Sequence, residues 1–83
     1  MQIGKITHYY DKIGVAVVTV VNHPLKVGTI VKISGHDKEF TQAIQSLQID
    51  RKPVDHVDAG ESVGLKVDQP VKSGDVMYLV PGK

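Results

Sequence analysis

The apolar residues of this chain fall in short runs, and Gly, Pro, Asn and Asp interrupt these runs at regular intervals. Most of them are branched at Cβ, since the sequence contains 14 Val and 7 Ile against 4 Leu and 2 Met. Such side chains favour extended strands because their χ1 angles are restricted in helices. No stretch of helical length repeats its apolar residues every 3.6 positions. The sequence therefore predicts an all-β fold.

The runs and their flanking turn residues predict six short strands, over residues 3–10, 14–21, 29–34, 39–50, 62–67 and 76–80. Six strands of this length suggest a small barrel or a sandwich. A chain of 83 residues has too few strands for two stable sheets, and a closed sheet has no exposed edges. We therefore predict one domain over residues 1–83, folded as a six-stranded antiparallel closed barrel with Greek-key character.

The strand expected over residues 39–50 changes the parity of its apolar positions between Ile44 and Leu47. A β-bulge near residues 45–46 would keep both side chains pointing inward and would bend the strand around a barrel.

The strand expected over residues 14–21 is apolar on both sides. One side carries Val15, Val17 and Val21, and the other carries Ala16, Val18 and Val20. A strand of a solvated sheet usually has one polar face, and grouped apolar side chains on a surface usually mark an interaction site. We therefore predict that the outer face, which carries Val15, Val17 and Val21 or the opposite set, packs on a second copy, a partner protein or the chain's own connections at 22–28 and 52–60.

The charges of the chain are nearly balanced, with ten Lys and Arg against nine Asp and Glu and a net charge of +1. The lysines are spread along the chain and acids interrupt them. This distribution excludes tight, sequence-blind binding of many phosphates, which requires a basic stripe, and leaves contact with an RNA end open.

Cysteine is absent, which excludes disulfides, thiolate zinc sites and a cysteine nucleophile. Asp55, His56 and Asp58 share no fixed face and have no evident third ligand, so we predict no metal site and no cofactor. No apolar run approaches 18 residues, and the first residues do not resemble a signal peptide. We expect a cytoplasmic protein that does not bind membranes.

The chain uses arginine once, at Arg51, directly after an expected strand. An arginine offers a planar and permanently charged fork for a phosphate or a carboxylate. The alternative is a surface arginine that pairs with Asp50 or Asp55, and the sequence alone leaves both interpretations open.

Four segments together resemble domain II of the translational GTPases, the barrel found in elongation factor Tu and related factors. They are IGKITHYYDKIGVAVVTV, HPLKVGTIVKISG, SLQIDRKPVDHVDAGESVGLKV and PVKSGDVMYLV, and they cover nearly the whole chain. The resemblance implies the six-stranded barrel and a role in translation at the end of tRNA or at the ribosome.

The resemblance also implies a site for RNA. Gln48 and Arg51 match the strand-end acid and arginine that lie beside the aminoacylated 3′ end in that family, and Ser62 matches a polar position near the terminal nucleotide. Gln48 replaces a carboxylate, and Lys66 stands where the family has an apolar residue. Lys52, the lysine next to Arg51, completes the candidate set because an RNA site needs lysines near the arginine.

A phosphate-binding loop of the G-x-x-x-x-G-K-[ST] type is missing, so we predict that the chain binds no nucleotide. No nucleophile-elbow signature surrounds Ser46, Ser62 or Thr41, and we expect no enzyme. The sequence predicts a non-catalytic module that contacts RNA or the ribosome. The alternative is a protein-interaction or substrate-recognition barrel similar to the C-terminal barrel of collagenase-like peptidases.

Overall fold

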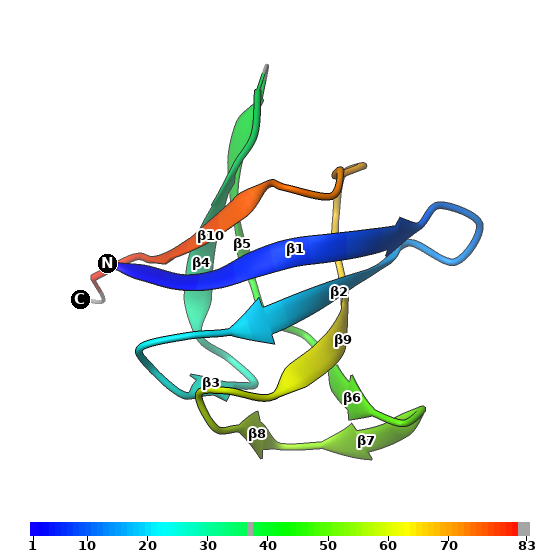
Figure 1. Ribbon diagram of the computed structural model, residues 1–83, viewed down its shortest axis with the longest axis vertical. Helices are drawn as coiled ribbons and strands as arrows, with labels where there is room; N and C mark the ends of the chain where they lie inside the picture. Colours follow the sequence, from blue (N-terminus) through cyan, green and yellow to red (C-terminus); the bar gives the residue numbers. More distant parts are fainter. Residues whose placement is uncertain (37, 82–83) are drawn as a thin grey trace.

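The computed structural model describes residues 1–36 and 38–81 and consists of strands joined by turns (Figure 1). The strands are β1 (Gln2–Tyr10), β2 (Val15–Val20), β3 (Leu25–Lys26), β4 (Ile30–Ser34), β5 (Glu39–Ala43), β6 (Leu47–Ile49), β7 (Lys52–Val54), β8 (His56–Val57), β9 (Ser62–Lys66) and β10 (Val76–Leu79). The all-β prediction is confirmed. Within the described part of the chain, no helix is long and apolar enough to cross a membrane.

Eight strands form one antiparallel sheet in the order β5-β4-β10-β1-β2-β9-β6-β7, and β3 pairs with β8 in a second, two-stranded sheet. Figure 1 shows the large sheet rolled up, with β1 and β2 crossing in front of β4 and β5. Among the described residues, no ladder joins the end strands β5 and β7. The predicted six-stranded closed barrel is therefore wrong in strand number and in closure.

The extra strands come from two places. The strand expected over residues 39–50 is divided into β5 and β6, and the break lies at residues 44–46, where the parity of the apolar positions changes. The chain turns sharply there and does not form the predicted bulge. This turn connects β5, at one end of the sheet, to β6, which lies next to β7 at the other end. The short strands β3, β7 and β8 form in connections that we expected to be irregular.

A buried glutamine links the end strand β5 to β9, on the opposite side of the rolled sheet. Gln42 of β5 is only 5% exposed, and its Nε2 donates to the carbonyl oxygen of Lys66 at 3.0 Å. Its Oε1 accepts a hydrogen bond from the backbone N–H of Asp68 at 2.8 Å. Hydrogen bonds of one side chain thus join β5 to the end of β9, two strands for which the described residues show no backbone ladder.

The core lies inside the roll and has an aliphatic composition. Ala16, Val18 and Val20 on the inner face of β2 are fully buried, as are Ile3 and Ile6 of β1. Burial of a valine or isoleucine stabilises the fold by about 1.5–3 kcal/mol. The inner face of β2 therefore supports the fold, and its outer face is available for other contacts.

Candidate functional site

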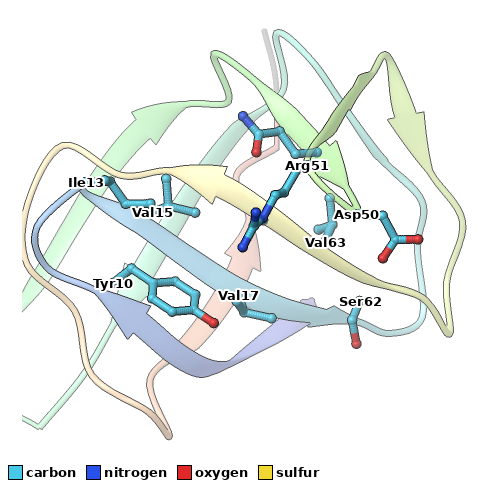
Figure 2. A pocket seen from close by; sticks show the side chains of 10 residues that line it. Tyr10, Ile13, Val15, Val17, Asp50, Arg51, Ser62 and Val63 are labelled. Carbon is cyan, nitrogen blue, oxygen red and sulfur yellow. The ribbon is translucent and has the colours of Figure 1, made fainter.

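The outer face of β1, β2, β9 and β6 carries an open depression of about 680 Å³, which we call the outer hollow (Figure 2). Its apolar residues are Tyr10, Ile13, Val15, Val17 and Val63. Its other residues are Gln48, Asp50, Arg51, Ser62 and Gly64.

The register of three strands assembles this hollow. Val17 of β2 lies opposite Gly64 of β9, and Gly64 lies opposite Gln48 of β6. Ser62 is two positions before Gly64 and therefore points to the same side of the sheet. Residues from distant parts of the sequence thus share one surface because their strands are neighbours.

Gly64 leaves the centre of the hollow without a side chain. A Cβ added at Gly64 would lie 3.4 Å from Val15 Cγ1 and 3.9 Å from the carbonyl oxygen of Gln48, which are ordinary contacts. Glycine inside a strand costs about 0.5–1 kcal/mol relative to alanine because it loses more conformational freedom on folding. The protein therefore has space for a larger residue here, and the glycine keeps the hollow open.

Asp50 and Arg51 form the two-residue turn between β6 and β7. Their φ angles are 53° and 68°, so both residues adopt the left-handed conformation, as in a type I′ hairpin turn. Asn and Gly are the usual residues of this turn, and a residue with a Cβ costs roughly 1–2 kcal/mol in this conformation. The chain thus places its single arginine at a position that glycine would fill at a lower conformational cost.

The Arg51 side chain points into the hollow. Figure 2 shows it extending across β9 toward β2, with Tyr10, Val15 and Val17 around its end. Lys32 and Glu39 form the only ion pair among the described residues. Arg51 is exposed, but it forms no ion pair with Asp50 or Asp55 in this structure.

The apolar side of the hollow is incompletely covered. Tyr10 is 49% exposed and Ile13 is 59% exposed, while Val15 and Val17 are half-buried. The connections at 22–28 and 52–60 contribute no residue to its lining. The chain's own loops therefore do not shield this face, and its packing on another molecule stays a prediction.

Five of the residues singled out in the sequence come together in the hollow: Gln48, Arg51, Ser62, Val15 and Val17. Three others lie outside its lining. Lys66 flanks it opposite Val15, Lys52 lies in β7 opposite Ile49, and Val21 follows β2, where its N–H donates to the carbonyl oxygen of Ile3 at 3.0 Å. The lysines expected around Arg51 thus do not line the hollow with it.

Sequence reasoning missed five residues of the lining: Tyr10, Ile13, Asp50, Val63 and Gly64. No local pattern indicates that Tyr10 and Ile13 lie beside the valines of β2. Asp50 was missed because Asp-Arg is not a recognised turn sequence, so the tight hairpin that aims Arg51 was not foreseen.

The hydroxyl of Ser62 lies 3.5 Å from the Thr19 hydroxyl, within hydrogen-bond distance.

The loop residues considered for a metal site lie elsewhere. A second depression of about 670 Å³ contains Asp55, His56 and Asp58 together with His23. No group of three potential metal ligands occurs in residues 1–36 and 38–81.

The chain is similar to proteins named as peptidases. An uncharacterized protease of Methanocaldococcus jannaschii is 33% identical over 81 residues. The match covers 96% of this chain and 20% of the protease, so the chain spans about a fifth of the length of that relative. No known family profile matches the chain.

Two solved structures share the fold. Both are the C-terminal domain of a Geobacillus thermoleovorans protein assigned to the U32 peptidases, and one is its selenomethionine variant. The variant aligns with a TM-score of 0.87 at 23% identity over 94% of this chain and 98% of its own. The other aligns with a TM-score of 0.89 at 22% identity over 96% and 92%.

These relatives overturn the resemblance to domain II of the translational GTPases, and with it the predicted roles in translation and RNA binding. The motifs that carried the resemblance include Gly60 and Gly74, whose φ angles are 98° and 100°. These glycines occupy tight turns before strands. Small β folds of unrelated function share such turns, so the motifs do not identify a function.

Proposed function

We propose that this chain is a non-catalytic polypeptide-recognition domain, of the kind attached to the C-terminal end of U32 peptidases. The similarity to the archaeal protease and the shared fold of the two solved C-terminal domains support the association with peptidases. Absence of catalysis by the chain itself and a cytoplasmic location are parts of this proposal.

The outer hollow is the observation that carries the proposal. It combines half-buried valines, an exposed tyrosine and isoleucine, and a few polar groups on one open surface. Binding sites typically have this mixture, with apolar side chains that supply affinity and a few polar groups that fix orientation. A polypeptide presents matching apolar side chains and backbone amides, and it is the substrate class of a peptidase.

Equilibrium binding to defined peptides tests this proposal. Fluorescently labelled peptides, each with one large apolar residue between Gly and Ser residues, are titrated with the chain, and anisotropy is recorded. We expect binding that weakens roughly tenfold or more when Val15 and Val17 are both replaced by lysine, because a buried apolar contact is lost.

The control is Thr41→Lys, which adds one of these two positive charges to the exposed outer face of β5 and should leave affinity unchanged. Equal loss in the control, or no binding of any peptide by the parent protein, contradicts the proposal. Sedimentation at micromolar concentration shows whether a second copy occupies the face instead, which would also contradict it.

A further inference from the structure

We infer that the outer hollow binds a carboxylate together with the large apolar side chain beside it. A polypeptide offers this pair at a carboxyl-terminal residue, or at an acidic residue within an apolar sequence. The inference rests on the proposed function and specifies which polypeptides the domain selects.

Hydrogen-bond donors are concentrated around the hollow. Arg51 supplies five N–H donors and no acceptor, and the amide of Gln48 and the hydroxyls of Tyr10 and Ser62 can also donate. Asp50 is the one carboxylate in the lining, and Figure 2 shows it on the side of Ser62, away from the Arg51 guanidinium. Lys66 adds a positive charge beside the hollow. The part of the hollow around Arg51 is therefore complementary to an anion, because Asp50 lies on the other side of it.

Arg51 is also available to a ligand. The ion pair between Lys32 Nζ and Glu39 Oε2, 2.9 Å apart, shows that this chain can pair its own charges, yet no described carboxylate pairs with Arg51. A guanidinium binds a carboxylate through two parallel hydrogen bonds, which are stronger than bonds between neutral groups. Two N–H groups of the Arg51 guanidinium therefore match the two oxygens of a single carboxylate.

The apolar part of the hollow lies directly beside that fork. Figure 2 shows Tyr10, Ile13, Val15 and Val17 grouped on the β1–β2 side of the Arg51 side chain. Gly64 leaves the strand between them and Gln48 without a side chain. A ligand whose carboxylate contacts Arg51 can thus place an aromatic or long aliphatic side chain over the valines.

Phosphate fits this site less well than carboxylate. Polyanion binding uses several cations that converge, but Arg51 is the one cation in the lining, with Lys66 beside the hollow and Lys52 in β7. One arginine above an apolar surface is better suited to a single charge with an apolar neighbour.

Two positions of the hollow also carry a conformational cost. Arg51 occupies a left-handed turn position, and Gly64 lies in a strand interior that has space for a Cβ. Such departures from local preference tend to gather at functional sites. Both residues belong to the outer hollow. Arg51 supplies its positive charge, and Gly64 leaves room for a ligand because it has no side chain.

The test compares four peptides on the chain by calorimetry or anisotropy. The first is Gly-Ser-Gly-Phe with a free carboxyl group, and the second is its amide. The third is an amidated peptide with Asp before Phe, and the fourth has a free carboxyl group but Gly in place of Phe. The amide without Asp lacks the carboxylate, and the peptide with Gly in place of Phe lacks the aromatic side chain. We expect each of these two to bind roughly ten- to a hundredfold more weakly than whichever of the first and third peptides binds more tightly.

The first and third peptides distinguish a terminal from an internal carboxylate. Arg51→Gly should abolish the difference between free and amidated peptides, while Lys52→Ser, which removes the adjacent cation, should preserve it. Inorganic phosphate at millimolar concentration should not compete.

If free and amidated peptides bind equally and Asp has no effect, the inference is wrong although the proposed function stands. If no peptide binds, both are wrong. Competition by phosphate that disappears in Arg51→Gly would overturn the preference for carboxylate.

Discussion

The two halves of the rolled sheet share one core but differ on their outer faces. On β4, β5 and β10 the outer face is more polar, although Ile30 is 40% exposed there: Lys32 pairs with Glu39 and lies 5.6 Å from the centre of the Tyr78 ring. The hydrogen bond and the negative charge of Glu39 raise the pKa of Lys32 above its ordinary value. On β1, β2, β9 and β6 the outer face is apolar, open and centred on an arginine that makes no ion pair with the described residues.

This difference shows which parts of the sequence the fold requires. Both halves bury the same kind of aliphatic side chain on the inside, so either kind of outer face is compatible with folding. A solvated face gains nothing from exposed valines, because they stabilise a protein only when they are buried. The exposed apolar side chains on the outer face of β1 and β2 therefore indicate a role in binding. The more polar outer face of β4, β5 and β10 provides the comparison within the same molecule.

The largest expected effect separates the two faces of β2. Val18→Lys places a charge at a position that is 0% exposed, and we expect it to destabilise the fold by about 3–5 kcal/mol or to unfold it. Val17→Lys, on the half-buried outer face, should cost about 1 kcal/mol or less. Urea unfolding followed by circular dichroism measures both. Similar losses for the two variants would show that the hollow belongs to the core.

Two glycines provide a second contrast. A Cβ at Gly4 would lie 2.6 Å from Val18 Cγ1, so Gly4→Ala overpacks the core and should cost about 1–3 kcal/mol. Gly64→Ala meets only ordinary contacts and should stabilise the strand by about 0.5–1 kcal/mol while it narrows the hollow. Free energies of unfolding and peptide affinities are measured for both variants. A destabilised Gly64→Ala protein would mean that the glycine serves folding.

The smallest effect on stability is expected at Arg51. Arg51→Gly relieves the left-handed backbone of a residue with a Cβ, but glycine also gains freedom in the unfolded chain, so the unfolding free energy should rise by about 0–1 kcal/mol. Thermal unfolding at low salt provides the measurement, with Lys52→Ser as the control. A clear fall in stability in Arg51→Gly alone would mean that the arginine holds the hairpin together.

The fold could be predicted from the sequence where local rules decide it. Branched side chains and regular turn residues indicated the strands that became β1, β2, β4, β9 and β10, and the parity change after Ile44 located the break between β5 and β6. Closure could not be predicted, because it depends on whether β5 forms a backbone ladder with a distant strand; in this structure β5 reaches the end of β9 through the Gln42 side chain.

The site was predicted only in part. Arg51 and the valines of β2 are conspicuous in the sequence, the first by its rarity and the second by their pattern. Their proximity depends on the antiparallel neighbours β2, β9 and β6, which no local pattern reveals. The part of Gly64 in the hollow could not be predicted either, because it depends on the side chains of the neighbouring strands.

Mapping of a bound peptide by NMR tests the central claim most directly, because it compares both outer faces in one experiment. The chain labelled with ¹⁵N is titrated with the tightest of the four peptides, and the amide shifts are followed. We predict that the shifts gather at Tyr10, Val15, Val17, Gly64 and Arg51, and that Lys32, Thr41 and Tyr78 remain unchanged. Shifts centred on the polar half, or spread evenly over both, would contradict the account.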